Sequence, residues 1–440
     1  MGTNKFDLYR PVPIAPLVGF RIGFGLLMFL SMIRFEWRGW VDTVYVRPSF
    51  HFTYMGFGWV RSLGSPGMHV LFIILIIAAL FIALGFLYRI SIVVFFLGFT
   101  YVELIDVTTY LNHYYFVSLI AFLLIWIPAN GDYSLDVRLR PERRRSLVPA
   151  WTIGIIRFQL AVVYIFAGLA KLNPDWLLQA EPMRTWLPAK SHLPVVGRLM
   201  YKEWVAWLFS WFGAIYDLFI VFFLMWGRTR TVAYGFVLVF HIATAIFFPG
   251  IGLFPYVMIV SSLIFFPASF FERGLPRFPG RSGQGAMGPG LQAGAVKWLL
   301  AIYVCIQVLI PMRYLVYPKG LFWHEEGYRF SWRVMLMEKS GAAYFTVRDS
   351  SGTKSWVVDN KDFLTPLQEK MMSTQPDMIL KYAHYLAKQY QARGIAAPKV
   401  YAEIYVALNG RRSRLFIDPA VNLAAQHLSW KHYSWVLPYE

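Results

Sequence analysis

Residues 151–176 read WTIGIIRFQLAVVYIFAGLAKLNPDW. The apolar run is long enough to cross a bilayer. It ends at a single lysine, Lys171, just before a break at Asn173-Pro174. An ionisable side chain at membrane depth is costly unless it is paired or neutralised, so Lys171 indicates a functional site. The alternative is an interfacial lysine whose amine reaches the lipid headgroups, and its position alone does not separate the two interpretations.

Similar apolar runs recur along the chain, which has 440 residues, of which 57% are hydrophobic and only 15% are charged. Repeated runs of membrane-spanning length are typical of a polytopic α-helical membrane protein. We predict about nine transmembrane helices by length and hydropathy. They lie near residues 14–33, 69–88, 90–106, 111–128, 151–172, 203–226, 231–248, 251–267 and 297–314.

The positive charges alternate between the loops. A formal charge of +18 could indicate nucleic-acid binding, but membrane proteins gather Lys and Arg in their cytoplasmic loops. Here the basic residues concentrate in 129–150, which contains RLRPERRR, and in 268–296. We therefore expect a cytoplasmic N-terminus, an outward-facing C-terminus and no nucleic-acid partner. The loop 34–68 fits less well, because it is assigned outside and yet contains four arginines.

The composition changes near the end of the last predicted span. Residues 272–295 are rich in Gly and Pro and predict a flexible linker inside a transmembrane domain of residues 1–315. Residues 316–440 predict a small α+β domain on the outer face. Strand-like runs surround a Ser-Gly turn near 351, one or two helices end at Gly394, and a hairpin turns at Asn409-Gly410.

Several unusual residues meet at the outer ends of the predicted spans. Lys171 ends the fifth span, Asn112-His113 opens the fourth, and His241 lies in the outer half of the seventh. The last span leads directly into LFWHEEGYRFSW at 321–332. His113 is otherwise explained as part of an aromatic belt, His241 as a packed histidine, and the two glutamates as a solvated loop pair.

One further cation lies inside a predicted span. Arg21 falls in the middle of GFRIGFGLLMF, and a buried arginine needs an internal partner. Asp217 and Glu103 are the candidates, and we expect all three to act as structural polar residues.

Common catalytic patterns are missing from the sequence. The histidines form no metal-binding i, i+4 pair, and one cysteine, Cys305, makes neither a thiolate cage nor a disulfide. We expect no metal site. GFGWVRSLG lacks the spacing of a phosphate-binding loop, and no serine stands in a nucleophile-elbow pattern.

Five collinear pieces of the chain resemble the vitamin K-dependent γ-glutamyl carboxylase family, including bacterial relatives that carry the horizontally transferred transmembrane (HTTM) domain. The pieces are YRISIVVFFLGFTYVELIDVTTYLNHYYF (88–116), VVYIFAGLAKLNPDW (162–176), VFHIATAIFFPGIGLFPYVMIVSS (239–262), WHEEGYRFSW (323–332) and LFIDPAVN (415–422).

The resemblance assigns roles to individual residues. Lys171 occupies the place of the family's catalytic base, and His113, after Asn112, that of its catalytic histidine. Substrate or quinol contacts are implied for Asn112, His241, Trp323, Tyr328, Ser331 and Trp332. Two departures weigh against recognition of a propeptide-tagged substrate: Ala170 and Gly327 stand where the animal enzymes have a lysine and a leucine.

The resemblance implies an enzyme that couples oxygenation of a reduced quinone, vitamin K or another membrane quinol, to carboxylation of glutamyl side chains. O2 and CO2 would be co-substrates, and membrane lipid and a Glu-containing peptide or protein the partners. The expected location is a bacterial inner membrane, with the C-terminal domain on the periplasmic face. The alternatives are a quinol oxygenase or epoxidase without protein carboxylation and a non-catalytic membrane scaffold.

Overall fold

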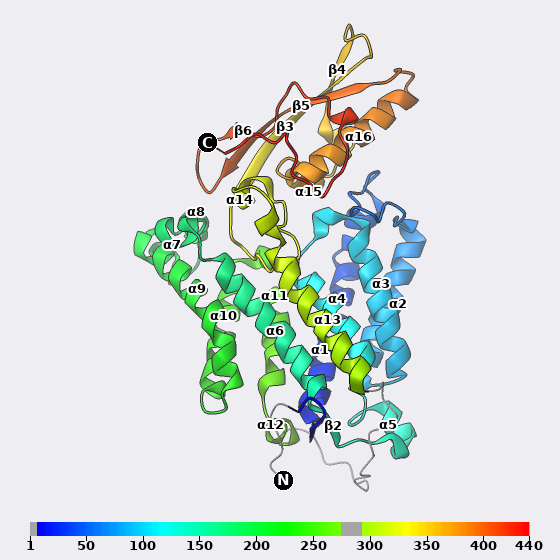
Figure 1. The fold of residues 1–440 in the computed structure, drawn as a ribbon, viewed down its shortest axis with the longest axis vertical. Helices are drawn as coiled ribbons and strands as arrows, with labels where there is room; N and C mark the ends of the chain where they lie inside the picture. Colours follow the sequence, from blue (N-terminus) through cyan, green and yellow to red (C-terminus); the bar gives the residue numbers. More distant parts are fainter. Residues whose placement is uncertain (1–6, 274–292, 440) are drawn as a thin grey trace.

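The computed structural model describes residues 7–273 and 293–439 and shows a helical bundle with a small sheet-containing part at one end (Figure 1). Residues 274–292 of the predicted linker near 272–295 lie outside the described residues.

Seven helices in the described part of the chain are long and apolar enough to cross a membrane. Two further apolar helices are shorter, α4 (Asn112–Trp126) and α11 (Phe254–Ser262). All nine predicted segments are helical, but a count of nine crossings is not confirmed, since these two fall below spanning length. The seven long helices are α1 (Ala15–Trp37), α2 (Gly64–Leu84), α3 (Tyr88–Ile105), α6 (Ala150–Ala170), α9 (Glu203–Met225), α10 (Arg230–Phe247) and α13 (Ala293–Met312).

The partner predicted for Arg21 is wrong. Its guanidinium donates to the backbone carbonyls of Ala129, at 3.3 Å, and Tyr133, at 2.6 Å. Carbonyl oxygens at the end of the bundle satisfy the buried cation, so it needs no carboxylate from another span. Asp217 therefore does not pair with Arg21.

The C-terminal part contains a four-stranded antiparallel sheet in the order β4-β3-β5-β6. The predicted strand pair is confirmed as β3 (Lys339–Arg348) and β4 (Ser355–Val358), and the two helices as α15 (Pro366–Met372) and α16 (Pro376–Ala392). The hairpin is confirmed as β5 (Lys399–Leu408) and β6 (Arg414–Leu415). Asn409 and Gly410 both have positive φ, 49° and 69°, as a tight hairpin turn requires.

Contacts with the loop 34–68 and with the end of α3 hold the sheet-containing part against the bundle. The loop 34–68, which includes the short helix η1 (Asp42–Val46), reaches it, because the rings of Phe50 and Tyr385 stack at 4.3 Å. The Gln368 side-chain amide donates to Asp106 at the end of α3. The loop 34–68 and the C-terminal part therefore share one end of the molecule.

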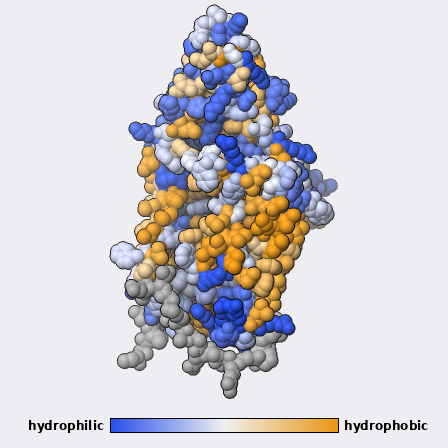
Figure 2. Space-filling model, turned by 90° about the vertical axis from the view of Figure 1, so that its right-hand side faces the viewer, coloured by the Kyte–Doolittle hydropathy of each residue, from blue (hydrophilic) through white to orange (hydrophobic). Residues whose placement is uncertain are grey.

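The other end carries the basic loop between α4 and α6. This loop contains α5 (Leu135–Leu139), η3 (Pro141–Arg143) and β2 (Leu147–Pro149), which pairs with β1 (Pro11–Pro13). Figure 2 shows a hydrophobic band between the hydrophilic C-terminal part and a hydrophilic patch at this opposite end. This distribution is what a bilayer-spanning bundle with polar caps requires.

Candidate active site

Lys171 lies where α6 ends. Asn173 caps the next helix, α7 (Pro174–Gln179), by accepting a hydrogen bond from the Trp176 amide, and Pro174 occupies its first turn. The Lys171 amine folds back along α6 and donates to the carbonyl of Ala167 at 3.2 Å. Carbonyls in the last turn of a helix lack intrahelical partners, so this position readily holds an amine.

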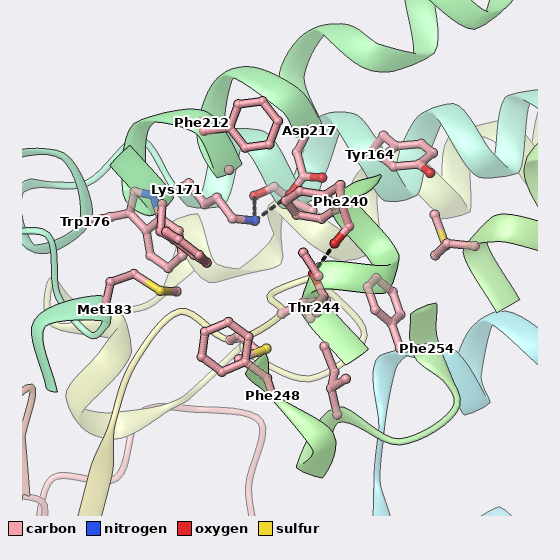
Figure 3. Close-up of a pocket in the computed structure, with 18 of the residues that line it drawn as sticks. Tyr164, Lys171, Trp176, Met183, Phe212, Asp217, Phe240, Thr244, Phe248 and Phe254 are labelled. Atoms are coloured by element: carbon pink, nitrogen blue, oxygen red, sulfur yellow. Dashed lines mark hydrogen bonds and ion pairs between the residues drawn. The ribbon is translucent and has the colours of Figure 1, made fainter. Parts of the chain in front are cut away.

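The same amine forms an ion pair with Asp217 on α9, with Nζ and Oδ2 2.6 Å apart (Figure 3). The two side chains are 7% and 8% exposed. Lys171 is therefore not a lysine that reaches the headgroups, because its amine points inward to a carboxylate on a neighbouring helix. A buried pair of this kind is stable only while both members are present.

The pair forms part of the wall of a cavity of about 360 Å³. Within the described residues, Lys171 and Asp217 are its charged lining residues, and the Trp176 ring lies 5.3 Å from the amine. The apolar lining comes from α6, α9, α10, α11, α8 (Met183–Trp186) and the loop after Trp332; it includes Val163, Ala167, Met183, Leu208, Phe209, Phe212, Val239, Phe240, Phe248, Ile251, Phe254, Met258, Val334 and Met335. Small-molecule sites typically combine an apolar lining with a few polar groups in this way.

The closeness of α6 and α9 depends on a glycine. A Cβ atom on Gly168 would lie 2.7 Å from the backbone nitrogen of Leu218, which follows Asp217. Only a residue without a side chain lets the helices approach this closely. Gly168 therefore sets the distance between the lysine and its carboxylate.

A second and larger cavity, of about 850 Å³, borders the first. His113, Tyr328 and Lys339 line it, and its walls are more polar than those of the apolar cavity. Five residues line both cavities and form a shared wall: Phe248, Ile251, Phe254, Val334 and Met335.

His113 is buried at the start of α4. Among the described residues, its Nε2 atom has no hydrogen-bond partner. The Asn112 side chain makes its hydrogen bonds elsewhere. Its amide donates to the carbonyl of Arg333 at 2.9 Å, and its oxygen accepts from the Tyr110 hydroxyl. Asn112 therefore fastens the start of α4 to the loop that follows Trp332 and lets the imidazole face the larger cavity.

His241 lies deeper in the bundle. Its Nε2 atom is 3.3 Å from the Tyr164 hydroxyl, and its ring lies 5.7 Å from Phe254, measured between centroids. His241 is in neither cavity lining, although Phe240 and Thr244 beside it line the apolar cavity. The structure thus places it behind the cavity wall.

The loop 321–332 separates into residues at the larger cavity and residues that pack. Tyr328 lines that cavity, and burial raises the pKa of its hydroxyl. The Ser331 hydroxyl donates to the carbonyl of Gly327, and Trp332 stacks on Tyr115 at 5.0 Å. Trp323 lies in neither cavity lining.

The Trp323 indole packs instead against the C-terminal part. It lies 4.9 Å from the ring of Phe416 and donates to the carbonyl of Leu437. Of the four residues assigned in this loop from the resemblance, Tyr328 alone lines the larger cavity directly.

A family model described as HTTM domain matches residues 9–270. A second, described as vitamin K-dependent gamma-carboxylase, lumenal domain, matches residues 292–440. The chain belongs to the vitamin K-dependent gamma-carboxylase family. No solved structure matches it.

In this gamma-carboxylase relative, the glutamates of the loop 321–332 are held in ion pairs, so their interpretation as a solvated pair is wrong. Glu325 pairs with Lys339 at 2.9 Å, and Glu326 with His432 at 2.7 Å. Burial lowers the pKa of Lys339, and the charge of Glu325 opposes that shift. These ion pairs fix the loop that carries Tyr328.

Sequence reasoning missed Asp217 as a site residue of this carboxylase relative. The available signal was an unpaired carboxylate in the middle of an apolar span, GAIYDLF, on the helix that follows the Lys171 segment. An intramembrane carboxylate and lysine on consecutive spans are natural partners. The positions of the two residues along their spans did not suggest the pairing. Asp217 lies in the middle of its span, whereas Lys171 lies at the end of its helix and its side chain reaches inward.

Proposed function

We propose that this membrane protein couples oxygenation of a reduced quinone to carboxylation of glutamyl side chains. The observation that carries the proposal is the Lys171 amine, held by Asp217 in the wall of an apolar cavity. Family membership supports a carboxylase-type enzyme, and the geometry supports a base acting on an apolar substrate.

The apolar cavity fits the ring of a membrane quinol in size and chemistry. Its volume of about 360 Å³ lies within the usual range of small-molecule sites, and its lining is aromatic and aliphatic. A reduced quinone, together with O2, would supply the strong base needed to remove a γ-proton from a glutamyl side chain. Trp176 and Phe212 would hold the ring, and the apolar walls would exclude water.

Lys171 would accept the proton of the bound hydroxyl. An ammonium cannot do this, so the amine must be presented in its neutral form at that moment. The Asp217 carboxyl, within hydrogen-bond distance, can hold the proton that the amine has given up. Asp217 would thus position Lys171 and keep the pair electrically neutral overall.

The larger cavity would admit the glutamyl side chain. His113, with its free Nε2 atom among the described residues, would donate to or accept from a reacting oxygen there. Tyr328 would contact the incoming peptide, and Lys339, although paired with Glu325, adds a cationic group that favours an anionic side chain. Because the two cavities meet at the shared wall, the two reactants would lie on either side of the same five residues.

The test combines purified protein, reduced vitamin K, isotopically labelled CO2 and a Glu-rich peptide. The proposal predicts that label incorporation and quinone epoxide both form and that both require Lys171. Epoxide without label would instead identify a quinol oxygenase or epoxidase without protein carboxylation. Absence of both products, with the protein shown to be folded, would favour the non-catalytic scaffold.

A further inference from the structure

A basic cavity of about 390 Å³ lies at the end of the bundle opposite the C-terminal part, where Figure 2 shows the hydrophilic patch below the hydrophobic band. It is formed where the first turn of α3, the end of α4 and the loop 128–145 meet. Its charged lining residues are Arg89, Asp136, Glu142, Arg143, Arg144 and Arg145.

The carboxylates that line this basic cavity do not balance the charge of its arginines. Asp136 is already occupied, because it accepts hydrogen bonds from the amides of Leu87 and Tyr88 and from Asn130. Arg144 pairs with Asp132 at 3.1 Å. None of the ion pairs found among residues 7–273 and 293–439 includes Arg143 or Arg145.

Arg89 adds to this excess. Its guanidinium donates to the carbonyl of Ile125 and so faces the basic cavity from the α3 side. The charges of Arg89 and Arg145 are close enough to repel one another. An anion bound between them would remove that repulsion and use the donors that point into the basic cavity.

An apolar groove of about 250 Å³ begins near the same end of α4, where Arg89 of the basic cavity donates to the carbonyl of Ile125, the residue before Trp126. Phe122 and Trp126 of α4, Trp151 of α6 and one face of α13 form it. Trp126 is only two residues from Pro128, which lines the basic cavity. Trp126, Leu299 and Ile302 are each about half exposed, so the groove opens towards lipid.

We propose that the basic cavity and the apolar groove together bind one anionic phospholipid. Its phosphate would lie among Arg89, Arg143 and Arg145, and an acyl chain would run along α13 past Trp126. The charge excess selects an anionic headgroup over a zwitterionic one. The continuous apolar groove selects a lipid over a free phosphate, because a soluble anion leaves the groove uncovered.

The experiment is native mass spectrometry of the full-length protein in detergent, titrated with phosphatidylglycerol, phosphatidylcholine or inorganic phosphate. The charge variant is Arg143→Gln/Arg145→Gln. Its matched control is Arg138→Gln/Arg140→Gln, which removes the same charge from exposed arginines of the same loop that do not line the basic cavity. The groove variant is Ile302→Trp. Its control is Leu309→Trp, which is also exposed on α13 but lies outside the groove.

We expect one phosphatidylglycerol to remain bound, with a dissociation constant raised roughly thirtyfold by Arg143→Gln/Arg145→Gln. The Arg138→Gln/Arg140→Gln and Leu309→Trp controls should bind as the unmodified protein does, and Ile302→Trp should bind more weakly. Equal losses in the two arginine variants would show diffuse attraction and overturn the site. Binding of inorganic phosphate as tight as that of phosphatidylglycerol, or unchanged lipid binding in Ile302→Trp, would overturn the assignment to a lipid.

Discussion

The Lys171 amine has two polar partners and a mostly apolar environment. The carbonyl of Ala167 and the carboxylate of Asp217 hold it, and the Trp176 ring lies 5.3 Å from it. A base in such a site is useful only if it can lose and regain a proton. Lysine can do so, and arginine, whose guanidinium stays protonated, cannot.

Lys171→Ala should therefore abolish quinol epoxidation and peptide carboxylation together. Lys171→Arg should also be inactive, because the retained charge does not replace a proton acceptor. Epoxide and labelled peptide are measured for both variants, with size-exclusion chromatography as the control for folding. An active Lys171→Arg enzyme would remove the assignment of Lys171 as the base.

Asp217→Asn should destabilise the protein, because breaking a buried ion pair leaves an uncompensated charge at a cost of about 3–5 kcal/mol. The double variant Lys171→Ala/Asp217→Asn should recover much of that loss, since neither charge remains. The midpoint of thermal unfolding in detergent, measured for both single variants and the double variant, gives the coupling between the two side chains. Simply additive effects would mean that the pair contributes no stability.

Tyr328→Ala should raise the KM for the peptide and leave quinol epoxidation largely intact. Tyr328 lines the larger cavity and not the apolar one, so its loss removes a peptide contact without touching the base. Steady-state kinetics with peptide and quinol varied separately distinguish the two effects. Equal loss of both activities would indicate that Tyr328 only supports packing.

At the level of helices, the sequence predicts positions well and pairings poorly. All nine apolar segments form helices close to the predicted ranges, because length and hydropathy determine them. The sequence did not settle the partners of Arg21 and Lys171, since helices that are apolar on every side do not show how they are rotated. Arg21 reached backbone carbonyls, and Asp217 was left for Lys171.

The site residues predicted from the resemblance fall into two groups, those that line a cavity and those that pack within the protein. Lys171, Asn112, His113 and Tyr328 line cavities because their places in the motifs correspond to the ends of helices and to the loop after the last long helix. Trp323 and Ser331 belong to equally recognisable motifs, but they pack or hydrogen-bond within the protein. A sequence motif alone does not distinguish a residue that lines a site from one that supports it.

Gly168→Ala should separate α6 from α9 and weaken the Lys171–Asp217 pair. The added methyl group would lie 2.7 Å from the Leu218 backbone, and overpacking of this kind typically costs about 1–3 kcal/mol. Gly154→Ala on the same helix is the control, because nothing lies within 4 Å of its added Cβ. Thermal unfolding and epoxidation are measured, and equal behaviour of the two variants would contradict the role of Gly168.

For the whole molecule, the distribution of arginines predicts an orientation in the membrane. The basic loop between α4 and α6 lies at one end and the sheet-containing part at the other. Because Arg and Lys gather on the cytoplasmic side, the C-terminal part should face outward. Alkaline phosphatase fused to the C-terminus should be active in a bacterial host, and a reporter that works only in the cytoplasm should be inactive there. The reverse result would invert the assignment.

The shared wall would also link the two cavities thermodynamically. Phe248 and Phe254 contact whatever occupies either cavity, so a ligand that moves them in one changes the shape of the other. Linkage is reciprocal: if the proposed substrates bind, the factor by which a quinol changes the affinity for the peptide must equal the factor by which the peptide changes the affinity for the quinol. In the proposed reaction, such coupling would favour formation of the strong base only when a peptide occupies the larger cavity.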